Sequence, residues 1–100
     1  MTPTEILIKA RELIADPKHW TQGQLARSNT GSYINPQHPS AVCFCSIGAL
    51  ERAAGGEFND AYYEARARLR DTLNRCIASF NDNHTHAQVL AKFDEAINHA

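Results

Sequence analysis

The sequence lacks a surplus of charge of either sign. Its ten lysine and arginine residues are balanced by eleven aspartate and glutamate residues, and the formal net charge is −1. Phosphate backbones attract proteins that carry a strong basic excess. We therefore do not expect the chain to bind nucleic acid.

A long apolar run is also missing. A helix that crosses a bilayer needs about 20 consecutive apolar residues, and no apolar segment of the chain approaches that length. The first residues, MTPTEILIKARELIADP, carry charges inside their apolar pattern, which is not typical of a signal peptide. We expect neither a membrane association nor an export signal.

Cysteine is scarce, and phosphate-binding loops are absent. Three cysteines, an odd number without an export signal, indicate reduced thiols in the cytoplasm rather than disulfides. Neither a GxGxxG motif nor a P-loop occurs in the chain. The sequence therefore predicts a cytoplasmic protein without a cofactor.

The composition that remains is an ordinary globular one. The chain has 100 residues, of which 43% are apolar and 21% charged. That length is typical of one domain with one modest core. Apolar residues recur at helical spacing along much of the chain. The sequence predicts a mainly α fold, with four helices in a single domain over residues 1–100.

Capping residues mark the first and the last predicted helix. Thr2 and Glu5 form a capping box at the N-terminus, and Pro17 ends the first helix because the residue before a proline avoids helical angles. Thr85 and Gln88 form a second capping box ahead of the closing helix. Each box predicts where a helix begins.

An almost wholly apolar segment predicts the second helix. Eight of the ten residues 41–50 are apolar, which is typical of a buried helix, and Ser40 is its predicted N-cap. Gly48 lowers helix stability by about 1 kcal/mol relative to alanine, so we expect another backbone to approach closely there. Gly55-Gly56 is predicted to end this helix.

The third helix is predicted to begin near Asn59, which is a good N-cap. Asn74 is the position at which this helix would break in two. Its charged face, which includes Glu64 and Arg68 at pairing distance, is predicted to face solvent. Its opposite face is an apolar stripe of Tyr62, Leu69, Leu73, Cys76 and Phe80.

Residues 17–40 are the least regular part of the chain. A turn signal at residues 29–32 predicts a small β-hairpin that pairs residues 24–28 with residues 32–35. A loop without strands is the alternative, because isolated hairpins are marginally stable. Trp20 and Tyr33 are expected to pin this region to the helices.

One candidate site is a reactive thiol. A cysteine near a helix N-terminus can be nucleophilic, and Cys45 with Asp82 and His86 would supply the residue types of a thiol-dependent enzyme. We favour core packing for Cys45, because free cysteine is among the most buried residue types. We also favour a structural role for Asn81-Asp82, whose side chains are expected to bind backbone amides at a turn.

A metal site is a second alternative. Cys43, Cys45, His84 and His86 are residue types that suit zinc. Their spacing does not, because residues two apart face nearly opposite sides of a helix of about 3.6 residues per turn. We predict no metal site and keep this set as the alternative.

The third candidate is a surface for a partner. Arg66 and Arg70 lie one helical turn apart at the edge of the apolar stripe, where they would hold a carboxylate or a phosphate of a partner. The alternative is that their stems cover the core while their charges stay in water. Tyr63 beside them would anchor a protein contact.

Four sequence marks follow one another in a specific order. They are Trp20 after the first helix, the segment Cys45-Ser46-Ile47-Gly48-Ala49-Leu50, the pair Asn81-Asp82, and an amphipathic helix from Val89 to Ile97. In this order, over most of its length, the chain resembles a family of short bacterial and phage proteins that carry a domain of unknown function. The resemblance implies no established activity, so it supports the fold more than a function.

The same resemblance bears on the candidate sites. It singles out Cys45 rather than Cys43, and Asp82 rather than either histidine, which weakens the catalytic triad. We therefore expect a small cytoplasmic protein-interaction or regulatory module, associated with a phage or mobile element, that binds a protein partner without catalysis. A small thiol-dependent enzyme that uses Cys45 with His86 and Asp82 is the alternative. An enzyme would place Cys45 at a cleft beside a base, whereas a module would bury it.

Overall fold

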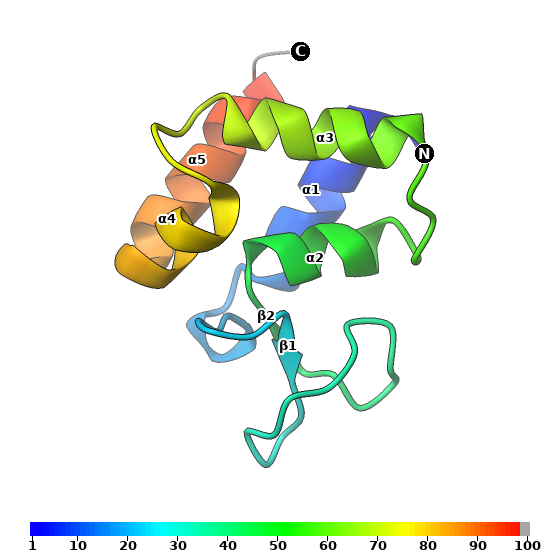
Figure 1. Cartoon of the computed structure of the whole chain (residues 1–100), viewed down its shortest axis with the longest axis vertical. Helices are drawn as coiled ribbons and strands as arrows, with labels where there is room; N and C mark the ends of the chain where they lie inside the picture. The colour runs from blue at the N-terminus through cyan, green and yellow to red at the C-terminus, as the bar shows by residue number, and fades with distance from the viewer. Residues whose placement is uncertain (99–100) are drawn as a thin grey trace.

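The computed structural model describes residues 1–98, and within them the chain is mainly helical (Figure 1). The five α-helices of the described residues are α1 (Pro3–Leu13), α2 (Ser46–Ala53), α3 (Asp60–Arg70), α4 (Ile77–Asn83) and α5 (His86–Asn98). A 3₁₀ turn (Pro17–His19) and two short strands, β1 (Ala26–Arg27) and β2 (Cys43–Phe44), lie between α1 and α2. The predicted mainly α class is confirmed, with five helices instead of four.

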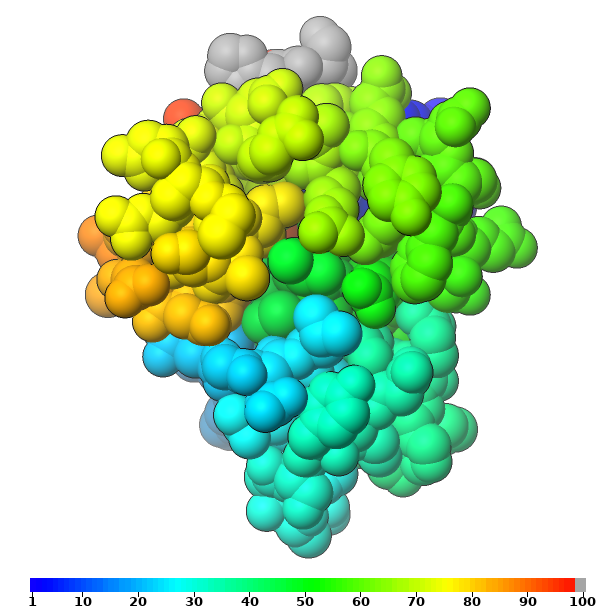
Figure 2. Space-filling model, in the orientation of Figure 1, coloured from blue at the N-terminus to red at the C-terminus, as the bar shows by residue number. Residues whose placement is uncertain are grey.

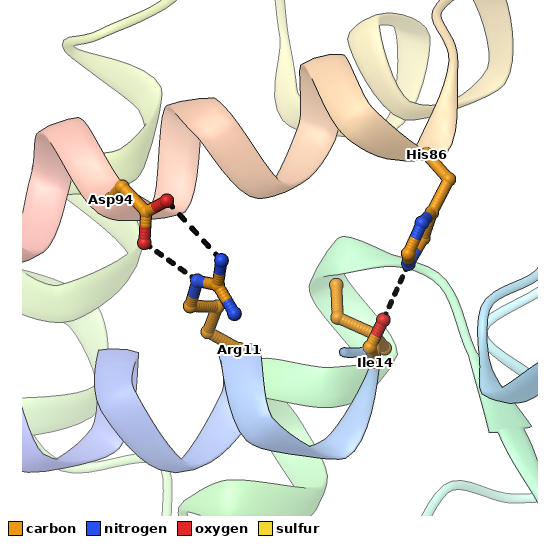
Figure 3. A network of polar contacts seen from close by, with 4 residues as sticks. All are labelled: Arg11, Ile14, His86 and Asp94. Atoms are coloured by element: carbon orange, nitrogen blue, oxygen red, sulfur yellow. Dashed lines mark hydrogen bonds and ion pairs between the residues drawn. The ribbon is translucent and has the colours of Figure 1, made fainter. Parts of the chain in front are cut away.

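Helix α1 lies at the centre of the helical body. It packs against α2, α3 and α5, and in Figure 1 it passes behind α2 and α3. Arg11 of α1 and Asp94 of α5 form an ion pair with an Nε–Oδ1 distance of 2.6 Å (Figure 3). The largest fully buried apolar side chains come from four helices and the residue after α1: Ile6, Leu7, Ile14, Leu50, Tyr62, Leu69, Val89 and Phe93.

Both predicted capping boxes are formed. Thr2 Oγ1 accepts a hydrogen bond from the Glu5 amide at 3.1 Å, and Glu5 Oε1 accepts one from the Thr2 amide at 2.8 Å. At the start of α5, Thr85 Oγ1 and the Gln88 amide are 3.2 Å apart, and the Thr85 amide and Gln88 Oε1 are 2.9 Å apart. The predicted beginnings of the first and last helices are confirmed.

The second helix begins later than predicted. Ser40 is not its N-cap: Cys43 and Phe44 form strand β2, and Cys45 is the residue that caps α2. The apolar segment therefore contains a two-residue strand followed by the first part of a helix. An uninterrupted apolar run has no periodicity that separates the two. The predicted end is confirmed, since the helix stops just before the glycine pair, where Gly55 and Gly56 have φ angles of 66° and 78°.

The predicted hairpin forms only in part. Arg27 and Tyr33 make an isolated antiparallel bridge, and the Ser28 amide donates to the Ser32 carbonyl at 2.9 Å. The sheet itself pairs β1 with β2 in antiparallel register, with Arg27 opposite Cys43. This pairing buries Phe44, whereas Tyr33 is 57% exposed. The expectation that Tyr33 pins this region to the helices is therefore wrong.

The third predicted helix is two helices. α3 ends at Arg70 and α4 begins at Ile77, so the break predicted at Asn74 lies in the connecting segment. Because the chain turns there, Cys76 leaves the predicted apolar stripe and is exposed.

The charged face of α3 is not wholly solvated, which corrects the prediction for Arg68. Its Nη1 donates to Thr4 Oγ1 of α1 at 2.9 Å, and its Nη2 donates to the Ala96 carbonyl of α5 at 3.0 Å. The guanidinium group therefore ties three helices together, instead of pairing with Glu64 on the surface of its own helix.

The close backbone approach predicted at Gly48 is confirmed. A Cβ atom on Gly48 would overlap the backbone carbonyl of Leu25, the residue before β1. That same carbonyl accepts a hydrogen bond from the Cys45 amide at 3.1 Å. The first turn of α2 therefore lies directly against the chain that leads into the sheet.

We predict that Gly48→Ala lowers the free energy of unfolding by about 1–3 kcal/mol, because the added methyl group overpacks this contact. Urea denaturation of both proteins measures the difference. In an open helical position the same change would stabilise the protein by about 1 kcal/mol. An increase in the urea midpoint would therefore contradict the close approach.

Candidate functional site

A fully buried amide, the side chain of Asn81 in α4, is the centre of a hydrogen-bond cluster. Its Oδ1 accepts from Trp20 Nε1 at 2.8 Å, from the Ser46 amide at 3.0 Å and from Ser46 Oγ at 2.8 Å. Its Nδ2 donates to the Thr21 carbonyl at 3.0 Å. Both ends of the amide are satisfied, which a buried polar group requires. We call Trp20, Thr21, Ser46 and Asn81 the Asn81 cluster.

The loop that follows the 3₁₀ turn is bound to the end of α4. Gln22 Nε2 donates to the Asn81 carbonyl at 3.0 Å and to the His84 carbonyl at 3.2 Å. Asp82 Oδ1 accepts from the Gly23 amide at 2.9 Å. The expectation that Asn81 and Asp82 bind backbone amides is confirmed, with the amides supplied by α2 and by this loop. The expectation that they form a turn is wrong, because both residues lie inside α4. Three of the four sequence marks thus meet in one place.

Cys45 is a buried thiol, 6% exposed, at the start of α2. Its Sγ accepts a hydrogen bond from the Gly48 amide at 3.4 Å. Burial raises the pKa of Cys45, and the nearby negative charge of Asp82 raises it further. Cys45 and Asp82 line the same hollow of about 210 Å³. The thiolate is therefore disfavoured in the place where an enzyme would need it.

The two histidines proposed for catalysis are engaged elsewhere. His86 Nε2 is hydrogen-bonded to the Ile14 carbonyl at 2.6 Å (Figure 3), and its ring lies 5.5 Å from the Trp20 ring. His84 Nδ1 is hydrogen-bonded to the Phe80 carbonyl at 2.9 Å, and its ring stacks on that of Phe80. Neither histidine is hydrogen-bonded to Cys45, so the structure of residues 1–98 does not assemble the proposed triad.

The alternative metal set is not brought together either. Cys43 Sγ donates to the Arg27 carbonyl at 3.8 Å, whereas Cys45 Sγ faces the first turn of α2. In residues 1–98, no group of three or more histidine, cysteine, aspartate or glutamate side chains lies close enough to hold a metal ion. None of the helices described in that range has the length and apolar character required to cross a bilayer.

The three predicted partner-binding residues do lie together. Tyr63, Arg66 and Arg70 line one groove of about 580 Å³ between α2, α3 and α4. Figure 2 shows the hollow where the green, yellow-green and yellow segments of these helices meet. We call it the α2–α3–α4 groove. It is lined by Ile47 of α2, by Tyr63, Arg66, Ala67 and Arg70 of α3, and by Cys76, Ile77 and Ala78 at the start of α4.

Each of the two groove arginines has one side-chain hydrogen-bond partner among the described residues. Arg66 Nη1 donates to Tyr62 Oη at 3.3 Å, and in the described residues Arg66 forms no ion pair. Arg70 pairs with Asp71 at 3.2 Å, but both side chains are mostly exposed, and such pairs contribute little stability. Burial raises the pKa of Glu51 in α2, and the charge of Arg66 opposes that shift.

We predict that Asn81→Asp destabilises the protein by about 2–4 kcal/mol at neutral pH, because a buried carboxylate replaces the donor to Thr21 and lies beside Asp82. The folded state would raise the pKa of the new carboxyl group. The loss of stability should therefore be largest at neutral pH and shrink as the pH falls through that raised pKa. Urea unfolding at several pH values measures it. A loss of stability that does not vary with pH would contradict the buried position of the Asn81 side chain.

We predict that alkylation of the native protein modifies Cys76 first and Cys45 last, because Cys76 is exposed and Cys45 is buried with a raised pKa. Mass mapping of the labelled peptides at neutral pH measures the order. In concentrated urea, which serves as the control, the three thiols should react at similar rates. A native protein in which Cys45 reacts fastest would restore the thiol-enzyme hypothesis.

Comparison with known proteins identifies the family of the chain. The model of the family of unknown function DUF6197 matches residues 1–99 of the chain. No curated protein and no solved structure matches it. A match over almost the whole length confirms the resemblance to a domain of unknown function that the sequence indicated. The chain therefore belongs to DUF6197, a family whose function is unknown.

Proposed function

We propose that this chain is a small cytoplasmic protein-interaction module that binds a partner protein through the α2–α3–α4 groove and regulates it without catalysis. The observation that carries the proposal is the grouping of Tyr63, Arg66 and Arg70 on one face of α3, along an apolar groove. Tyrosine and arginine are among the residue types that contribute most to protein interfaces. From the sequence resemblance alone, we also propose a bacterial or phage setting.

An exposed aromatic ring outside the groove, that of Phe58, extends this surface. Tyr63 is 56% exposed and Phe58 is 50% exposed. Both rings contact Tyr62, with centroid distances of 5.1 Å and 4.8 Å. Large apolar side chains that gather at the surface are typical of interaction sites. The aromatic rings and the groove together offer a partner a broader surface than either one alone.

The thiol-dependent alternative has less support. Its nucleophile, Cys45, is buried with a raised pKa, and the two histidines nearest in the sequence to Asp82 are bonded to backbone carbonyls. Binding of a partner in the groove requires neither a reactive thiol nor a catalytic base. The side chains of the groove suit recognition, because apolar contacts supply affinity and paired guanidinium groups supply orientation.

We predict that Ala78→Trp weakens partner binding, because Ala78 is an exposed groove residue and the added indole would occupy space that the partner needs. The test immobilises the protein, captures proteins from a lysate of the source cells and quantifies them by mass spectrometry. At least one identified protein should be retained by the parent and lose about tenfold or more on Ala78→Trp, equivalent to about 1.4 kcal/mol.

Ala91→Trp is the matched control, because Ala91 is an exposed alanine of α5 that does not line the groove. It should retain the same proteins as the parent. Melting temperatures of both variants check that the fold is intact. Equal retention by the two variants, or no protein retained specifically by the parent, would contradict the proposed function.

A further inference from the structure

We propose that the α2–α3–α4 groove binds an acidic segment of its partner, in which two carboxylates lie beside an apolar anchor on the same side of the segment. The inference rests on the proposed function and names the chemistry of the partner. Of the eight residues that line the groove, two are arginines and none is a carboxylate. The chain as a whole has a net charge of −1, so this positive charge belongs to the groove and not to a generally basic protein.

The spacing of the arginines sets the spacing of the carboxylates. Arg66 and Arg70 are four residues apart in α3, which separates their backbone positions by about 6 Å along the helix axis. In an extended segment, side chains two residues apart lie on the same side and are separated by about 6.6 Å. Two acidic residues separated by one residue therefore match the two guanidinium groups, each of which can bind a carboxylate through parallel hydrogen bonds.

Four of the other six residues that line the groove are aliphatic, and these select the anchor. Ile47, Ile77 and the side chains of Ala67 and Ala78 contribute no hydrogen-bonding groups, so a polar side chain placed among them would lose its partners in water. A volume of about 580 Å³ has room for a large aliphatic or aromatic side chain beside the carboxylates. The anchor supplies apolar contact, while the acidic residues fix the orientation of the segment.

The same features argue against a polyanion as the occupant. A nucleic acid would present regularly repeated phosphates and would need a longer basic track than two arginines. Both side chains of the ion pair between Arg70 and Asp71 are mostly exposed, and such a pair contributes little stability, so a carboxylate of the partner can replace Asp71 at small cost. A protein segment with two carboxylates and one apolar anchor needs no longer basic track than these two arginines, and one of its carboxylates can take the place of Asp71.

The test selects peptides from a random library displayed on phage. Three proteins are used as bait: the parent, the double variant Arg66→Glu/Arg70→Glu, and a control, Lys18→Glu/Arg75→Glu. The control changes the net charge by the same amount at exposed positions that do not line the groove. The parent and the control should select peptides with two acidic residues and an apolar residue. The groove variant should lose the acidic preference and select basic residues instead.

A synthetic copy of the best acidic peptide then provides the affinity measurement. Its binding should weaken by about tenfold or more on Arg66→Glu/Arg70→Glu, equivalent to about 1.4 kcal/mol, and should remain unchanged in the control. The peptide should also slow the alkylation of Cys76, which lines the groove. If the glutamate variant does not fold, Arg66→Gln/Arg70→Gln replaces it and should still weaken binding.

Several outcomes would overturn this inference. The parent could select peptides without an excess of acidic residues, or the groove variant could keep the acidic preference. The library could also yield no peptide whose binding depends on the groove, or a single-stranded oligonucleotide could displace the acidic peptide. A partner that Ala78→Trp releases but whose bound segment is neutral or basic would leave the proposed function intact and remove only the acidic segment. The two failures are therefore distinguishable.

Discussion

The structure depends on one constraint: the buried amide of Asn81 must have a hydrogen-bond partner at each of its atoms. Its Oδ1 meets donors from Trp20 and Ser46, and its Nδ2 meets the Thr21 carbonyl. A buried polar group without a partner costs about 1–3 kcal/mol. Any arrangement that moves one of these segments away from Asn81 leaves such a group and is therefore disfavoured. One side chain thereby fixes the segment after α1, the start of α2 and the end of α4.

The groove is a consequence of this arrangement. Ile47 follows Ser46 directly in α2, and Ile77 and Ala78 lie one turn before Asn81 in α4, so the amide that joins the two helices also sets the distance between two walls of the groove. The third wall, α3, is held separately, because Arg68 binds α1 and α5 on its other side. The face of α3 that carries Tyr63, Arg66 and Arg70 therefore lies at the surface of the molecule.

The sequence was informative wherever a structure is determined by near neighbours. The capping boxes at Thr2 and Thr85 are bonds between residues three apart, and the clustering of Arg66 with Arg70 follows from helical periodicity. The partners of Asn81 outside α4 lie 35 to 61 residues away in sequence, and no local pattern identifies them. Strand β2 was hidden for another reason, since its apolar run is compatible with strand and helix alike.

Helix α4, from Ile77 to Asn83, has seven residues. A helix of that length has too few internal hydrogen bonds to offset the entropy of its own nucleation in water. It persists because Ile77 and Phe80 are buried in the core and because Asn81 and Asp82 anchor it to residues 20–23 and to α2. Its formation and the docking of that loop are therefore one cooperative event. The backbone amides of both segments should exchange their hydrogens with solvent through a shared opening, with similar protection, as a single folding unit assembled from distant parts of the chain.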